Sequence, residues 1–230
     1  MKTFKNRLFF NFSYFLLWVA YFVFARFFFI LFHFNRTKEL GFFTTLKTFL
    51  YGLRLDSSFA AYLSTIPFLL IIFTVFYKTD LTVRIIKWYS AIIIIFISLL
   101  LIIDTSLYNA WGGRLDTSIL PYLSTPKLMV SSASTFQLVS GVILWGLISF
   151  IFIKIFNKII QKRILKIEKS FWVQSPLFLL ITASLILPIR GGLQTIPVNQ
   201  SNVYFSNKMF ANHAAVNFAW NFFNTLTHKT

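Results

Sequence analysis

Five stretches of the chain are apolar over a length that suits a membrane-spanning helix. Crossing the hydrocarbon core of a bilayer takes about 20 predominantly apolar residues in an α-helix. The pattern predicts an all-α integral membrane protein with five transmembrane helices, at about residues 8–34, 57–77, 85–108, 128–153 and 170–189. The first stretch is longer than the apolar region of a signal peptide, about 7–15 residues, so we expect it to remain as an anchor.

A segment at about 41–54, between the first two predicted spans, is amphipathic rather than uniformly apolar. Phe42, Leu46, Phe49 and Leu53 recur with helical spacing, while Lys47 and several threonines fall on the other side. Such a segment suits a helix that lies flat in the membrane interface. We therefore predict an interfacial amphipathic helix at 41–54, with a partly buried connector against the bundle as the alternative.

Composition supports lipid as the solvent for much of the chain. Hydrophobic residues make up 57% of the sequence and charged residues only 12%, against about 45–50% and about 25% in soluble domains. This excludes a disordered chain and almost every class of soluble enzyme. The chain has no cysteine, which excludes disulfides, thiolate chemistry and cysteine-based metal sites.

The charge balance predicts an orientation. Lys and Arg number 22 against 6 Asp and Glu, giving a net charge of +16, and membrane proteins retain basic loops on the cytoplasmic side. The loop between the fourth and fifth predicted spans carries a run of basic residues: Lys154, Lys158, Lys162, Arg163, Lys166 and Lys169. We therefore place the N-terminus inside and, after five crossings, the tail at 190–230 outside, as an extracytoplasmic linker. Contact with anionic lipid explains the basic loop better than binding of nucleic acid does.

With this orientation, polar residues from separate connections collect at the outer face. These are Arg54, Asp56, Asp104, Tyr108, Arg114, Asp116 and Arg190. Ionisable groups within or beside spans are candidates for function, so the cluster is a candidate site for a lipid headgroup. The alternative is a structural role, in which ion pairs lock the outer loops together.

Two charged residues, Arg26 and Asp104, fall inside predicted spans more than three residues from either end. A carboxylate such as that of Asp104 costs about 2.5–3.5 kcal/mol at the centre of a spanning helix. Arg26 lies in the first span, and we hypothesise an intramembrane ion pair between Arg26 and Asp104. The alternative is that each side chain snorkels to the interface independently.

The sequence shows no motif for metal or nucleotide chemistry. None of His33, His213 and His228 has a partner at the spacing of a helical metal motif, and metal ligation needs clustered ligands. No phosphate-binding loop and no nucleophile elbow are present. We expect no catalytic residue and no metal site in this chain.

Several short motifs near the outer ends of the spans occur in a recognisable order. They are Gly52-Leu53-Arg54-Leu55-Asp56, Asp104 to Tyr108, Arg114-Leu115-Asp116, Tyr122-Leu123-Ser124-Thr125-Pro126, Arg190-Gly191-Gly192-Leu193-Gln194, Asn202-Val203-Tyr204-Phe205-Ser206-Asn207, Asn212-His213-Ala214 and Val216-Asn217. In this order they resemble the N-terminal membrane domain of the lipoteichoic acid synthase-like family. That family includes phosphoglycerol transferases and sulfatase-like hydrolases of the alkaline phosphatase superfamily. The resemblance covers nearly the whole chain and is strongest from Arg190 to Trp220.

The resemblance implies a multi-pass protein of the bacterial inner (plasma) membrane with its C-terminus outside. It also implies a catalytic domain beyond Thr230, in which a threonine nucleophile and a divalent metal, commonly manganese, transfer glycerol phosphate from a lipid. The expected role of this chain is then to anchor that domain, with anionic phospholipid and its own catalytic domain as partners. The alternative is a stand-alone membrane scaffold or a small transporter. Against transport, the two halves show no internal repeat.

Overall fold

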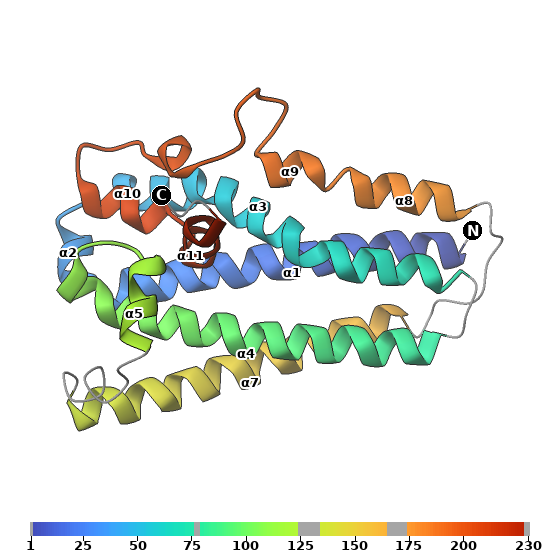
Figure 1. The fold of residues 1–230 in the computed structure, drawn as a ribbon, viewed down its shortest axis with the longest axis horizontal. Helices are drawn as coiled ribbons and strands as arrows, with labels where there is room; N and C mark the ends of the chain where they lie inside the picture. The colour runs from blue at the N-terminus through green and yellow to red at the C-terminus, as the bar shows by residue number, and fades with distance from the viewer. Residues whose placement is uncertain (1, 76–78, 124–133, 165–173, 228–230) are drawn as a thin grey trace.

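The computed structural model describes residues 2–75, 79–123, 134–164 and 174–227. These residues form helices joined by short connections, without a strand among them, which confirms the all-α prediction for this part of the chain. Within it, four helices are long and apolar enough to cross a membrane. They are α1 (Lys2–Phe32), α3 (Phe42–Phe73), α4 (Thr79–Trp111) and α7 (Thr135–Ile164). Figure 1 shows them side by side along the long axis of the molecule.

The helix α3 corrects the expected division at residues 54–57. The interfacial helix predicted at 41–54 and the span predicted from 57 are one continuous helix from Phe42 to Phe73. The polar residues at the expected division do not interrupt the helix, because Asp56 is fully buried and paired with an arginine. Gly52 and Pro67 also lie within α3.

The stretch predicted as a fifth span is divided into two shorter helices. They are α8 (Ser175–Ala183) and α9 (Ile186–Arg190), both packed along α3. Pro188 accounts for the division, because a proline has no amide hydrogen for the carbonyl group four residues earlier and its ring clashes with that group. The count of five spans is therefore not reproduced by the long helices. The predicted beginnings of the fourth and fifth spans, and residues 124–126 of the Tyr122–Pro126 motif, lie outside the described residues.

The core of the bundle is built on one face of α1. Tyr14, Trp18 and Tyr21 are fully buried and recur at three- and four-residue spacing, so they share a face of the helix. The ring of Trp18 lies 4.8 Å from that of Phe156 on α7. The Tyr14 and Tyr21 hydroxyl groups lie 2.8 Å from serine hydroxyl groups of α4. Aromatic packing and interhelical hydrogen bonds replace the hydrophobic effect, which does not hold helices together in lipid.

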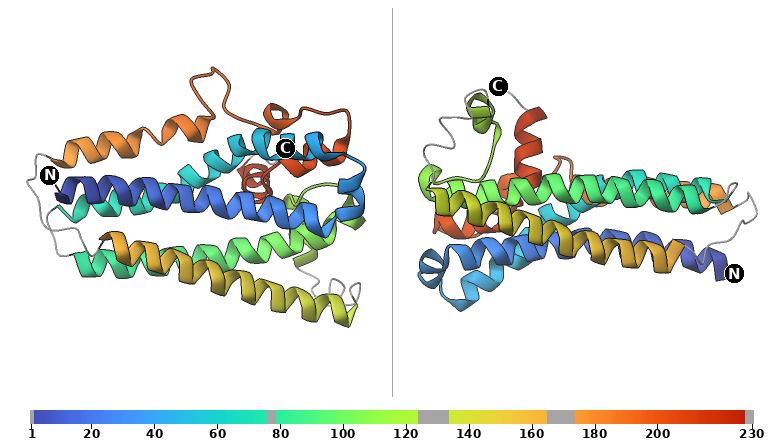
Figure 2. Two further views of the ribbon diagram at one scale, coloured as in Figure 1. Left: turned by 180° about the vertical axis from the view of Figure 1, so that it is seen from behind. Right: turned by 90° about the horizontal axis from the view of Figure 1, so that it is seen from below.

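Six short elements gather at the end of the bundle opposite the start of α1, whereas α8 lies beside that start (Figures 1 and 2). They are α2 (Phe34–Lys38), the 3₁₀ helix η1 (Thr117–Ile119), α5 (Leu120–Leu123), the 3₁₀ helix η3 (Gln200–Val203), α10 (Met209–Ala215) and α11 (Phe218–Thr227). We call this end the capped end. The last three elements belong to the predicted linker, and α10 and α11 pack on the long helices α3 and α4. This part of the tail is therefore folded onto the bundle.

Candidate functional site

A buried ion pair joins α1 to α3 at the capped end. Arg26 Nη2 lies 2.6 Å from Asp56 Oδ2, and both side chains are buried. Gly52, one turn before Asp56, makes room for this arginine, because a Cβ atom at Gly52 would lie 2.1 Å from Arg26 Cζ. The predicted ion pair between Arg26 and Asp104 is therefore wrong in its partner. The physical reason is that α3 continues through residue 56, so the Asp56 carboxylate meets Arg26 inside the bundle.

The tail completes this ion pair. Arg26 Nη1 donates a hydrogen bond to the Ala214 carbonyl oxygen at 2.5 Å. Asn217 Nδ2 donates to Asp56 Oδ1 at 2.9 Å. Each charged group of the pair therefore also binds the tail, one at α10 and the other at the start of α11. Because a buried charge is costly unless it is paired and hydrogen-bonded, these contacts favour the docked tail.

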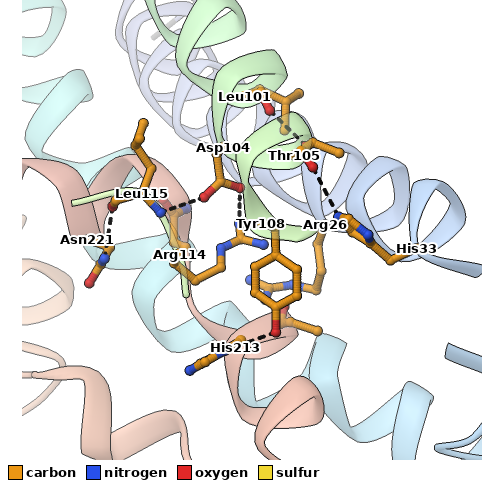
Figure 3. Close-up of polar contacts among 12 residues, drawn as sticks. Arg26, His33, Leu101, Asp104, Thr105, Tyr108, Arg114, Leu115, His213 and Asn221 are labelled. Carbon is orange, nitrogen blue, oxygen red and sulfur yellow. Dashed lines mark hydrogen bonds and ion pairs between the residues drawn. The ribbon is translucent and has the colours of Figure 1, made fainter. Parts of the chain in front are cut away.

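A second buried ion pair fixes the loop after α4. Arg114 Nη2 lies 3.1 Å from Asp104 Oδ2. Figure 3 shows this contact as a dashed line. The Leu115 amide donates to Asp104 Oδ1 at 2.8 Å. Asn221 Nδ2 on α11 then donates to the Leu115 carbonyl oxygen at 2.9 Å. The charge of Asp104 is thus balanced by an arginine of the loop after α4, and the same loop is attached to the tail.

Aromatic and imidazole groups surround the second ion pair. Arg114 Cζ lies 4.0 Å from the centroid of the Phe29 ring, which is close enough for a cation–π interaction. The Phe29 ring meets Tyr108 edge to face at 4.9 Å. The Tyr108 hydroxyl oxygen lies 2.9 Å from His213 Nδ1 of α10. These contacts join α1, α4 and the tail around one arginine.

Two histidines in this region are held neutral by their surroundings. The pKa of His33 is lowered to about 4, mainly by burial, with a contribution from the nearby positive charges of Arg114 and Arg36. Because a carbonyl oxygen only accepts, His33 Nε2 carries the proton in its 3.1 Å hydrogen bond to Thr105 O. Burial also lowers the pKa of His213, with Arg114 contributing. A charged imidazolium at either position would oppose the arginines already present.

The remaining predicted residues lie at two other places. Arg54 Nη2 donates to Gln194 Oε1 at 2.5 Å, and Arg190 Nη2 donates to the carbonyl oxygens of Gln194 and Thr195 at 3.3 and 3.0 Å. These two arginines therefore hold the loop after α9. Asp116 caps η1 by accepting a hydrogen bond from the Ser118 amide at 2.8 Å.

Of the predicted cluster, the structure brings together Asp56, Asp104, Tyr108 and Arg114, with Arg26 beside them. The sequence interpretation did not assign roles to the residues that connect these charges to the tail: Gly52, His33, His213, Asn217 and Asn221. Three of these residues, Gly52, His213 and Asn217, fall in the motifs quoted for the family resemblance. That was the only sequence signal that could have drawn attention to them.

The arrangement is not that of a metal centre. Among the residues that the structure describes, no group of three or more His, Cys, Asp or Glu side chains is placed to hold a metal ion. Both buried carboxylates are instead paired with arginines. The manganese-type metal implied by the resemblance therefore has no fitting ligand set in this part of the chain.

Comparison with protein-family models, with curated proteins and with solved structures gave no match. The resemblance to the lipoteichoic acid synthase-like family thus rests on the sequence motifs. What the structure establishes is a helical bundle with long apolar helices, in which two buried ion pairs at the capped end connect the long helices to the folded tail.

Proposed function

We propose that this chain is the membrane-anchoring domain of a lipoteichoic acid synthase-like phosphoglycerol transferase or sulfatase-like hydrolase of the bacterial inner membrane. Its role is to hold an extracytoplasmic catalytic domain at the membrane surface. The observation that carries the proposal is the docking of the tail, whose Ala214 carbonyl and Asn217 side chain bind the buried Arg26–Asp56 pair. A domain joined to α11 would start from a fixed point on the bundle.

The distribution of basic residues supports the proposed orientation. The helix α1 begins, and α7 ends, at the end of the bundle opposite the capped end (Figure 1). The last turn of α7 contains Lys162 and Arg163, and Lys5 and Arg7 lie in the first turns of α1. Basic residues beside short cytoplasmic loops set the orientation of membrane proteins, so the capped end faces outward in this proposal.

An anchor of this kind contributes to activity through concentration. An enzyme held at the membrane surface stays close to its lipid substrate. This raises the effective concentration of the lipid at the enzyme without any new contact between them. The tail contacts add a defined position to this effect, because the hydrogen bonds restrict where the following residues can lie.

A reporter fusion tests the proposal. A soluble phosphatase that is active only outside the cytoplasm is joined after Thr230, and the membranes are washed with alkaline carbonate. We expect phosphatase activity in whole cells, and retention of the fusion in the washed membranes. Absence of phosphatase activity in cells that contain the intact fusion, or release of the fusion by the wash, would contradict the anchoring role. A fusion before Lys2, expected to be inactive, serves as the matched control.

A further inference from the structure

The chain between α9 and η3 forms a closed loop that two arginines hold in place. The Val198 amide donates a hydrogen bond to the Arg190 carbonyl oxygen at 2.9 Å, which brings the two ends of the loop together. Arg190 Nη2 also donates to the Thr195 carbonyl oxygen at 3.0 Å. From α3, Arg54 Nη2 donates to the Gly191 carbonyl oxygen at 3.3 Å. We call this segment the 190–198 loop; a compact loop with adjoining ends is an Ω-loop, a type that is frequently functional.

Two large apolar side chains of the 190–198 loop face away from the protein. Leu193 is 92% exposed and Ile196 is 70% exposed. Figure 1 shows this part of the chain projecting to the side of the bundle beyond α9. Because water is an unfavourable environment for apolar side chains, a loop that is held in this shape needs an apolar environment around its tip.

The lengths of two neighbouring segments place the loop where the hydrocarbon core of a bilayer ends. From Arg54, which holds the loop, to its last residue Phe73, α3 rises about 30 Å at about 1.5 Å per residue. The apolar segment Ser175–Arg190, which leads into the loop, rises about 24 Å at the same pitch. The hydrocarbon core is about 30 Å thick. If the end of the bundle opposite the capped end lies at one boundary of the core, the loop therefore lies near the other.

The surface that leads to the loop has the character of a lipid-facing surface. Leu180 on α8 and Ile186 and Leu187 on α9 are exposed, so an apolar face runs along these helices up to the loop. Arg190, at the base of the loop, is also exposed. An arginine suits the boundary of a membrane, because its aliphatic stem lies in apolar surroundings while its charge stays in polar ones. The apolar tip thus continues the lipid-facing side of α8 and α9.

We propose that the 190–198 loop inserts Leu193 and Ile196 into the lipid bilayer, just below the headgroups on the side of the capped end. The partner is the apolar boundary layer of the bilayer as a whole, rather than one bound lipid molecule. The loop connects α9 to the folded tail, so its insertion fixes the depth of the tail relative to the membrane. The inference requires only that the long helices cross the membrane, so it stands independently of any catalytic domain.

A fluorescent probe in the loop tests the insertion. The chain has no cysteine, so Thr195→Cys places a single thiol between the two apolar side chains. The thiol is labelled with the environment-sensitive dye NBD, and the full chain is reconstituted into phosphatidylcholine vesicles. Two quenchers are compared: a doxyl group near the top of the lipid acyl chains, and iodide in the water on both sides of the membrane. Leu180→Cys on α8 serves as the lipid reference, and Ser201→Cys, exposed in η3, serves as the water reference.

We expect the probe at 195 to behave like the lipid reference, with quenching by the doxyl lipid and protection from iodide. The double variant Leu193→Ser with Ile196→Ser should expose the probe at 195 to iodide. The ratio of inserted to exposed loop should fall about tenfold or more, because burial of even one leucine or isoleucine side chain corresponds to about one tenfold step. Met209→Ser, which removes another exposed apolar side chain of the tail, should leave the probe at 195 unchanged.

Three outcomes would overturn the proposal. Access of iodide to the probe at 195 equal to that at 201 would mean that the loop lies in water. Equal quenching by the doxyl lipid in the native loop and in the double serine variant would mean that the dye, rather than Leu193 and Ile196, inserts. Protection of the probe at 195 from both quenchers would mean that a protein surface, such as that of a second copy of the chain, covers the loop.

Discussion

Substitution of Asp56 by alanine should release the tail from the bundle. The carboxylate pairs with Arg26 at 2.6 Å and accepts a hydrogen bond from Asn217 at 2.9 Å. Its removal leaves the buried Arg26 guanidinium without a counter-charge and with the Ala214 carbonyl oxygen as its remaining acceptor. Opening of the tail is then the simplest way for water to reach the charge.

The size of the effect follows from the burial of the pair. Removing one partner of a buried ion pair costs about 3–5 kcal/mol. At about 1.4 kcal/mol for each tenfold change, this corresponds to an increase of about 100-fold or more in the population of the open tail. A free-energy cost of this size is expected because the two side chains are buried, at 2% and 0% exposure, and water screens their charges only weakly.

Thiol labelling measures this opening. The chain has no cysteine, so Ala215→Cys introduces a single thiol at a fully buried position of the tail. We expect slow labelling in the otherwise unchanged chain and labelling faster by about 100-fold or more in the Asp56→Ala background. Glu39→Ala, which removes an exposed carboxylate at the capped end, should leave the rate unchanged.

A second substitution separates the charge effect from general damage. Arg26→Leu in the Asp56→Ala background removes the unpaired charge, and replacing a buried ion pair by apolar residues is often close to neutral. We therefore expect labelling to slow again in the double variant. Equal labelling rates of the Asp56→Ala variant and the double variant would refute the argument that the ion pair holds the tail. Additive effects of Asp56→Ala and Arg26→Leu on the labelling rate would refute it as well.

Three further predictions concern packing, protonation and interhelical hydrogen bonding. Gly52→Ala should lower the free energy of unfolding by about 1–3 kcal/mol through overpacking against Arg26, measured by chemical denaturation, whereas Gly146→Ala in open space should not destabilise. Because folding lowers the pKa of His33 to about 4, the unfolded chain binds more protons between about pH 6.5 and 4. The melting temperature should therefore fall as the pH falls through this window, and less so in His33→Gln; an unchanged pH profile would contradict the burial of His33. Tyr14→Phe, which removes the hydrogen bond to Ser90, should cost about 0.6 kcal/mol, the mean for such bonds in membranes, and a double-mutant cycle with Ser90→Ala would detect their coupling.

Hydropathy predicts the long helices better than their ends and breaks. The apolar stretches at 8–34, 85–108 and 128–153 all overlap long helices, because an unbroken apolar run permits little else in lipid. The prediction divides α3 because residues 41–54 are amphipathic, a pattern that in isolation is typical of an interfacial helix. Only the partner of Asp56 on another helix explains why the chain stays helical through that point.

The partners within the site depend on tertiary structure in the same way. Sequence placed Asp56, Asp104 and Arg114 at one level of the bundle, which the structure brings together around Arg26. It predicted the wrong partner for Arg26, Asp104 in place of Asp56, because all of these charges lay within reach of one another. The role of Asn217 was equally inaccessible, since its amide becomes relevant only once the tail folds back on α3.

Cysteine accessibility from the two sides of the membrane tests the central claim, a multi-pass bundle with its capped end outward. Ser201→Cys lies in η3 at the capped end, and Lys162→Cys lies in the last turn of α7 at the opposite end; both positions are exposed. In intact spheroplasts, a membrane-impermeant maleimide should label the cysteine at 201 and should reach the one at 162 only after permeabilisation. Labelling of both cysteines from the same side would contradict the account.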